Sequence, residues 1–274
     1  PIQSADIQAQ CEKSFTRYID SYFPPDMTSL FGKGADLTSY DTTPFAWNRP
    51  ESIYPQGYTI LSRISPEKVK PGVFPDNYFV SAVAILAENP ILLTRLFSKS
   101  EVNLAGVYGI WLHINGSWQE IVIDDSFPFV SIHNEVRFAS SHSSSNDLWL
   151  PLLHKAYAKA YGSYLKVTAG ILSQALNDLT GAPCECVNFE SGNLGGDALW
   201  KKMEISERKG HIIAFNVLKK HFHRILEGGT GLVVGMAYRL ISAFEHDLGN
   251  GKRERYVQLR SLWGKVSLAQ LWPE

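Results

Sequence analysis

The apolar residues in the first part of the chain recur at helical spacing, with polar residues between them. One such stretch opens at Asn77, and Asn is a residue that favours helix starts. Pairs of neighbouring residues that contain Pro or a helix-capping residue separate these stretches, as expected at helix boundaries. The pattern predicts a helical first lobe that extends to about residue 170. The predicted helices cover residues 6–22, 77–88, the segment after Asn89-Pro90, and 147–162.

A hairpin interrupts this helical pattern. Residues 108–114 and 118–123 are rich in β-branched and aromatic side chains, and Asn115-Gly116 lies between them. Asn-Gly suits the left-handed dihedral angles of a type I′ turn, so we expect two antiparallel strands here.

The pattern changes after Gly170. One further helix is predicted over residues 197–209, and strands dominate the remainder. The predicted fold class is therefore α+β, with a helical domain over residues 1–170 and a β-rich domain over residues 171–274. The expected strands cover residues 211–218, 231–244 and 256–263.

Composition narrows the class of protein. The 274 residues are 45% hydrophobic and 12% aromatic, which favours a packed globule over disorder. A net charge of −1 argues against nucleic-acid binding. No apolar run is long enough and free enough of charge to span a bilayer, and no signal peptide is apparent. Three Cys, an odd number, indicate a reducing compartment, so we expect a cytoplasmic protein. The absence of an initiating Met suggests a piece of a longer chain.

Seven segments, in order, resemble the protease core of the calpain family. The most specific is DLWLPLLHKAYAKAYG, which is similar to the family helix E-F-W-x-x-L-L-E-K-A-Y-A-K-x-x-G. The family core usually continues beyond the segment LRSLWG, so we expect the second lobe to be incomplete. The seven segments are Phe23-Pro24 with Ser29-Leu30, Trp47–Pro50, Lys68–Leu86, Trp118–Asp125 with Pro128, Asp147–Gly162, Gly231–Tyr238 and Leu259–Gly264.

The resemblance implies a papain-like, two-lobe fold and a proteolytic site of Cys, His, Asn and an oxyanion-binding Gln. Here the Cys position holds Asn77, and the His position holds Met236. The Asn position holds Ser261, and the Gln position holds Pro71. A carboxamide is not a thiolate nucleophile, a thioether shuttles no proton, and proline has neither a side-chain donor nor an N–H. We therefore expect no intact catalytic residue, with Asn77 capping a helix and Met236 filling apolar space.

Other candidate sites have simpler explanations. Cys184, Cys186, His221 and His223 could supply four zinc ligands, but one-residue spacing does not match common zinc sites. His113 and His154 are expected to be surface or packing residues. The paired carboxylates Asp124-Asp125 could do acid–base work, but we expect capping or ion pairing.

Calcium is the metal that the resemblance implies, with acidic ligands in each lobe. Lys68 and Asp147 occupy two of these positions in the first lobe, and Ser267 occupies one in the second. An ammonium group repels a cation, so we expect no cofactor and a degenerate calcium site. One hypothesis is that Lys68 pairs with Asp147 in place of the metal. The other is that both are independent surface charges.

These observations favour a non-proteolytic module that binds protein partners or has a structural or regulatory role. The resemblance extends the expected partners to the cytoskeleton and to other domains of a longer chain. Two alternatives stay open: an active hydrolase with an unorthodox site, or a regulator of a protease domain elsewhere in the full chain.

Overall fold

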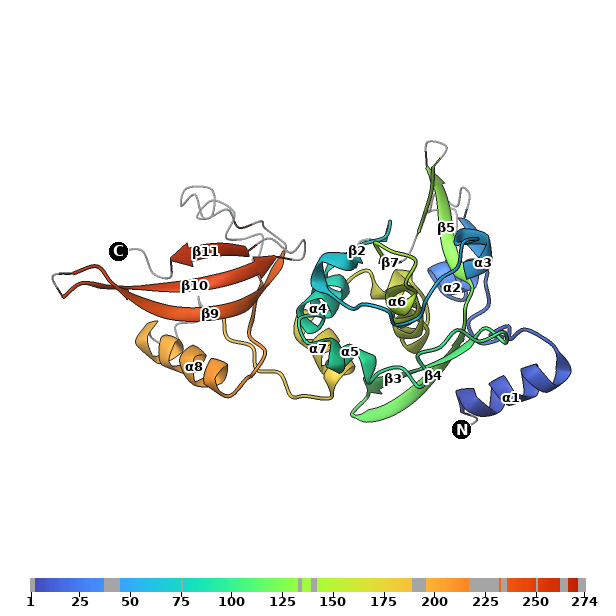
Figure 1. Ribbon diagram of the computed structural model, residues 1–274, viewed down its shortest axis with the longest axis horizontal. Helices are drawn as coiled ribbons and strands as arrows, with labels where there is room; N and C mark the ends of the chain where they lie inside the picture. Colours follow the sequence, from blue (N-terminus) through green and yellow to red (C-terminus); the bar gives the residue numbers. More distant parts are fainter. Residues whose placement is uncertain are drawn as a thin grey trace. The chain divides into compact units, whose positions relative to one another are not determined.

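The computed structural model describes two compact units, which meet between Cys184 and Glu185. Both units combine helices with small antiparallel sheets, as the predicted α+β class requires (Figure 1). The described residues are 3–36, 45–74, 76–132, 135–138, 142–188, 196–216, 232, 236–249, 251–261 and 266–270, with the backbone alone at 131, 132, 135–137 and 266–270.

Unit 1 holds most of the helices and three small sheets. Its sheets have the strand orders β1-β5-β6, β2-β7 and β3-β4. The elements are α1 (Ser4–Ser14), α2 (Met27–Phe31), β1 (Phe45–Asn48), α3 (Pro50–Ile53), the 3-10 helix η2 (Pro66–Lys68), β2 (Val69–Lys70), α4 (Asn77–Leu86), α5 (Pro90–Thr94), β3 (Val107–Ile114), β4 (Ser117–Asp124), β5 (Phe127–Ile132), β6 (Glu135–Phe138), β7 (His142–Ser143), α6 (Trp149–Tyr161), the 3-10 helix η3 (Leu165–Val167) and α7 (Leu172–Thr180).

The boundary between the units lies further along the chain than the predicted position near residue 170. The reason is α7, which the sequence interpretation missed. Leu172, Ala175 and Leu179 are buried on one face of this helix. That face packs against α4 and β3, so α7 belongs to unit 1.

The first helix is shorter than the predicted span of residues 6–22. It ends at Ser14, because Phe15 adopts the left-handed conformation with φ of 55°. The chain then continues without helical structure, and the Tyr18 N–H donates to the carbonyl of Ala105 at 2.8 Å.

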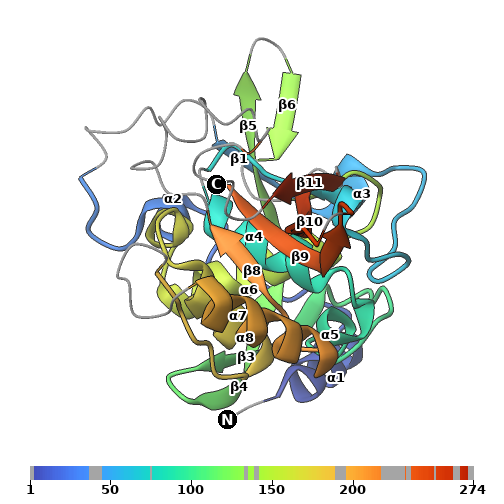
Figure 2. The ribbon, with the colours of Figure 1, turned by 90° about the vertical axis from the view of Figure 1, so that its left-hand side faces the viewer.

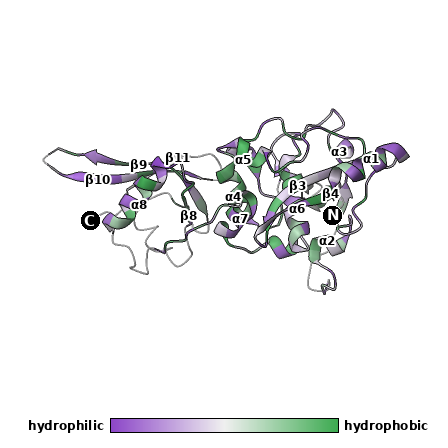
Figure 3. Ribbon diagram, turned by 90° about the horizontal axis from the view of Figure 1, so that it is seen from below, coloured by the Kyte–Doolittle hydropathy of each residue, from purple (hydrophilic) through white to green (hydrophobic). Residues whose placement is uncertain are grey.

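The core of unit 1 is built on α4 and α6. Eight residues of α4 are buried, and the helix is hydrophobic along its length (Figure 3). Every residue of α6 from Trp149 to Ala158 is buried, including the side chains of His154 and Lys155. The Phe79 ring from α4 stacks on Tyr157 from α6, with ring centres 4.6 Å apart. Burial of this many apolar side chains is the main force that holds such a unit together.

The predicted hairpin is confirmed. Strands β3 and β4 pair antiparallel from Val107↔Asp124 to Ile114↔Ser117. Asn115 and Gly116 join them with φ angles of 53° and 78°. Both angles are positive, as a type I′ turn requires.

Within the residues that the structure describes, unit 2 contains one antiparallel sheet and one helix. The strand order is β11-β10-β9-β8, and α8 packs against β9 (Figure 2). Trp200 and Met203 of α8 join Tyr238, Val257 and Leu259 in a buried cluster. The elements are α8 (Gly196–Arg208), β8 (Ala214–Asn216), β9 (Ala237–Asp247), β10 (Arg253–Ser261) and β11 (Val266–Gln270).

Within the part of the chain that the structure describes, no helix is both long enough and apolar enough to cross a membrane.

Candidate functional site

The loop before α4 carries two of the positions singled out in the sequence. Pro71 and Asn77 are both exposed, and Asn77 is the first residue of α4. The sequence interpretation assigned the helix cap to Asn77, but Asp76 occupies the N-cap position. The backbone carbonyl of Asp76 accepts from the N–H groups of Phe79 at 2.9 Å and Val80 at 3.1 Å. A helix start stabilises negative charge, but an uncharged carboxamide at Asn77 makes no use of it.

Behind Asn77 lies a buried contact between α4 and α6. The Nε2 atom of His154 is 3.1 Å from Oδ2 of Asp76, and both side chains are at most 1% exposed. The His154 ring stacks on Phe79 and meets Tyr164 edge-on. Burial lowers the pKa of His154, and the charge of Asp76 opposes this only in part. A ring enclosed in this way cannot reach a substrate, so the predicted packing role of His154 is confirmed.

The other predicted histidine, His113, is partly exposed on β3. Its Nδ1 atom lies 3.4 Å from Oδ1 of Asn177 on α7, and its ring meets Trp118 edge-on. These contacts join the hairpin to α7, so His113 also has a packing role.

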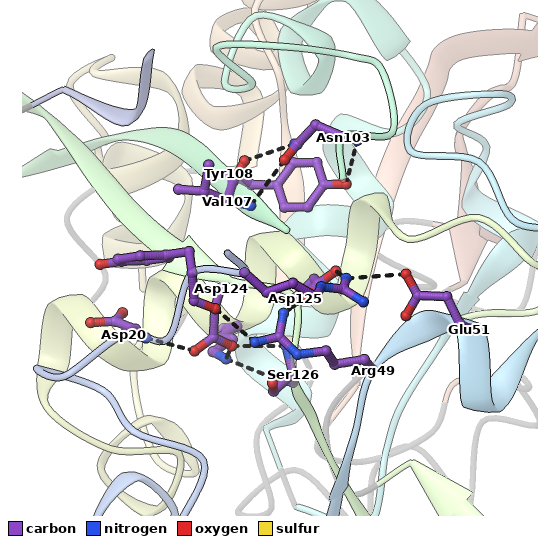
Figure 4. A network of polar contacts seen from close by, with 12 residues as sticks. Asp20, Arg49, Glu51, Asn103, Val107, Tyr108, Asp124, Asp125 and Ser126 are labelled. Atoms are coloured by element: carbon purple, nitrogen blue, oxygen red, sulfur yellow. Dashed lines mark hydrogen bonds and ion pairs between the residues drawn. The ribbon is translucent and has the colours of Figure 1, made fainter. Parts of the chain in front are cut away.

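The carboxylates of Asp124 and Asp125 lie in a buried ionic network at the end of β4 (Figure 4). Asp125 pairs with Arg49 and, at 2.8 Å, with Arg17. Asp124 pairs with Lys155 of α6 at 2.6 Å, and neither of these two side chains is exposed. The predicted ion-pairing role of the two aspartates is therefore confirmed.

The network has clear effects on the pKa values of its members. Burial lowers the pKa of Lys155, and Asp124 offsets part of that effect. Burial alone would raise the pKa of Asp124, but the charge and hydrogen bond of Lys155, together with the N–H groups of Asp20 and Ser126, lower it. Burial raises the pKa of Asp125, against the opposing charges of Arg49 and Arg17. All four carboxylate oxygens of Asp124 and Asp125 accept hydrogen bonds, which is the pattern of a structural centre.

Unit 2 carries the remaining two family positions. Met236 directly precedes β9 and packs, partly buried, against the cluster around Trp200 and Tyr238. Ser261 is the last residue of β10 and lies opposite Tyr238. The thioether of Met236 thus fills apolar space, as the sequence interpretation expected.

The hypothesis of a Lys68–Asp147 pair is wrong. The two groups form no ion pair, and Lys68 Nζ instead donates to Ser145 Oγ at 3.3 Å. Asp147 is buried, so it is not an independent surface charge either. Its two carboxylate oxygens accept hydrogen bonds from the loop at residues 59–63.

We call this loop contact the Asp147 clamp. Its donors are the hydroxyl of Thr59 at 3.0 Å, the hydroxyl of Ser62 at 2.6 Å, the N–H of Ser62 at 3.1 Å and the N–H of Arg63 at 3.0 Å. Backbone bonds add to it, since the N–H of Leu148 donates to the Thr59 carbonyl at 2.9 Å. The clamp ties the loop to the start of α6.

The donors of the clamp do not fit a calcium ion. Calcium requires six to eight oxygen ligands with available lone pairs. Here N–H and O–H groups point at both oxygens of Asp147, and the second expected ligand position holds the ammonium of Lys68. The side chain of Ser267 lies outside the described residues, and its backbone pairs with Leu259. The described residues contain no group of three or more His, Cys, Asp or Glu side chains placed to hold a metal ion.

The zinc hypothesis concerned Cys184, Cys186, His221 and His223. Both cysteines are exposed and form no disulfide. The two histidines lie outside the described residues.

Three segments of the family resemblance correspond to α4, to strand β4 and to the buried helix α6. A comparison with known families identifies the family. The chain belongs to the calpain family of cysteine proteases, whose sequence profile matches residues 18–274.

Individual relatives agree with this assignment. Calpain-5 of Caenorhabditis elegans is 26% identical over 96% of this chain and 44% of its own length. Calpain-type cysteine protease DEK1 of Arabidopsis thaliana is 30% identical over 94% of this chain and 12% of its own length. Calpain-12 of Homo sapiens is 29% identical over 98% of this chain and 36% of its own length. The chain therefore spans less than half the length of these curated relatives.

Proposed function

We propose that this chain is a calpain-type domain that does not cut peptides and acts instead as a protein-binding module with a structural or regulatory role. The observation that carries the proposal is Asn77 at the start of α4, because the resemblance assigns the family's Cys to this position. A carboxamide cannot form the thiolate that attacks a peptide carbonyl.

The positions of the three cysteines support the proposal. Cys11 lies in α1, and Cys184 and Cys186 lie in the exposed segment where the two units join. The sequence has no cysteine between Cys11 and Cys184, so no thiol is available on α4 or in the loop before it. Asp124, Asp125 and Lys155 offer no substitute, because they are buried and engaged with one another or with arginines.

We also propose that the domain keeps its fold without calcium. The Asp147 clamp supports this, because amide and hydroxyl donors occupy the carboxylate that the family resemblance assigns to the metal. The large size of the relatives is consistent with further domains in the full protein, and those domains are the first partners to consider. The cytoplasmic and cytoskeletal location stays a prediction, which imaging of the tagged full-length protein would test.

The test is a casein-cleavage assay on purified full-length protein, with and without calcium, beside an active calpain as the positive control. We expect cleavage at background level in both conditions. Cleavage that disappears in an Asn77→Ala protein would overturn the proposal and favour an unorthodox hydrolase. A broad probe for Cys and Ser nucleophiles gives an independent measure, since labelling lost in the same variant would have the same meaning.

A further inference from the structure

A groove in unit 1 has no part in the site described above. It is about 420 Å³ in volume, and its lining residues come from the α5 segment, the β3–β4 hairpin and the end of α7. Figure 1 shows these three elements close together. That volume is at the small end of the range for ligand pockets and suits one or two large side chains. The residues that matter for its chemistry are Leu92, Arg95, Leu96, Trp111, Trp118 and Leu179.

The fold fixes the shape of this groove. The N–H of Trp111 donates to the carbonyl of Leu96 at 2.7 Å, which attaches the segment after α5 to β3. Gly181 has φ of 68° at the end of α7, and a Cβ there would lie 3.0 Å from the Trp118 ring. Glycine at this position therefore lets the indole approach the turn, while His113 meets the same indole edge-on. Trp118 is held between two elements although it is 46% exposed.

The groove presents one charge beside its apolar walls. Arg95 is exposed, and it is the charged residue among those that line the groove. Among the described residues its guanidinium takes part in no ion pair or hydrogen bond, unlike those of Arg17, Arg49 and Arg255. An exposed guanidinium beside two tryptophans has the composition of a binding hot spot, where Trp and Arg are over-represented.

We propose that this groove binds an internal protein segment in which an Asp or Glu side chain lies next to a large apolar side chain. The carboxylate would pair with the guanidinium of Arg95, which suits carboxylates through two parallel hydrogen bonds. The apolar side chain would lie between Leu92, Leu96, Leu179 and the two indoles. Arg95 and Trp118 are both open to solvent, so a partner chain can reach them from outside. The inference deepens the proposed protein-binding role by assigning it a surface and a partner chemistry.

The test is selection of a displayed random-peptide library on the purified chain, followed by anisotropy titration of the enriched peptides. We expect enriched sequences to place Asp or Glu beside Leu, Phe or Trp. Replacing that acidic residue with Gln or Asn should weaken binding about tenfold, and added salt should weaken it further. Arg95→Glu and Trp118→Ala should each reduce affinity by about tenfold or more.

Arg208→Glu is the matched control, because it makes the same charge change at an exposed position of α8. Thermal unfolding of each variant checks that the fold is kept, and Trp118→Phe provides a milder change if Trp118→Ala unfolds. The proposal is overturned if no peptide is enriched, or if the enriched peptides bind Arg95→Glu as well as the original chain. Casein cleavage on the same samples tests the non-proteolytic role separately. If the groove binds no peptide and casein is not cleaved, the groove proposal is wrong but the non-proteolytic role is still supported.

Discussion

The Nε2 atom of His154 lies 3.1 Å from Oδ2 of Asp76, in a place where neither side chain meets water. The contact joins α6 to the residue that caps α4. The two side chains thus form a buried support directly behind the exposed Asn77.

The burial of His154 makes stability depend on pH. Burial lowers the pKa of His154 in the folded protein below its ordinary value of about 6.5. Above that value the ring is neutral in both states, so it contributes no pH dependence. As the pH falls below about 6.5, the unfolded chain takes up a proton that the folded protein does not, and the free energy of unfolding decreases.

The slope from one such group approaches about 1.4 kcal/mol per pH unit. Urea unfolding between pH 5 and 7.5, values chosen to bracket about 6.5, should show a shallower slope for His154→Gln than for the original protein. His211→Gln, at an exposed position, should leave the slope unchanged. Equal slopes for His154→Gln and the original protein would show that His154 does not cause the dependence.

The Lys155–Asp124 pair should be costly to break. Lys155→Met leaves the buried carboxylate of Asp124 without its cation, and loss of one partner of a buried pair costs about 3–5 kcal/mol. Denaturant unfolding followed by tryptophan fluorescence measures this loss. Lys166→Met, at an exposed position, should stay within about 0.5 kcal/mol of the original protein. A similarly small effect for Lys155→Met would mean that the network contributes little to stability.

The Asp147 clamp predicts that replacing Asp147 lowers the free energy of unfolding even when no calcium is present. Asp147→Ala removes the acceptor for donors from Thr59, Ser62 and Arg63, and we expect a loss of about 2–4 kcal/mol. Lys68→Ala removes one long hydrogen bond to Ser145 and should cost less than about 1 kcal/mol. Calcium chloride should leave the melting temperature of the original protein unchanged. A rise that depends on calcium concentration, and that Asp147→Ala abolishes, would contradict the clamp.

Restoring one family residue should not restore proteolysis. Asn77→Cys supplies a thiol without the base or the oxyanion donor, and in a comparable triad the loss of one member costs about 10⁴–10⁶ in rate. We expect a fluorogenic peptide to remain uncut. Adding Met236→His, Ser261→Asn and Pro71→Gln, in the full-length protein, should give trace activity at most. Efficient cleavage by Asn77→Cys alone would mean that other groups already supply the missing roles.

The sequence was sufficient to predict elements that depend on residues close to one another in the chain. The Asn115-Gly116 hairpin formed as expected because two left-handed residues in succession favour one turn type. The helix from Asn77 and the helix ending at Gly162 also formed, with ends that differ by a residue or two from the prediction. Helix α7 was missed, although its apolar residues at 172, 175, 176 and 179 have helical spacing.

Contacts between residues that are far apart in the sequence could not be predicted from local patterns. The resemblance drew attention to Asp147, but its contact with Ser62 depends on how the loop at 59–63 folds over α6. Its opposite charge suggested Lys68 as the partner of Asp147. In the structure, hydroxyl and amide groups donate to Asp147 instead. Arg49 was noted only as part of a motif, and nothing local indicated that its guanidinium meets Asp125 across the unit.

Under the proposed function, a loop contact made of amide and hydroxyl donors would need no change in ion concentration to form. The contact of Thr59, Ser62 and Arg63 with Asp147 would then be the same at low and at high calcium concentration. Under the proposed function, how much of the protein a cell makes, and what it lies next to, would then decide when the module acts.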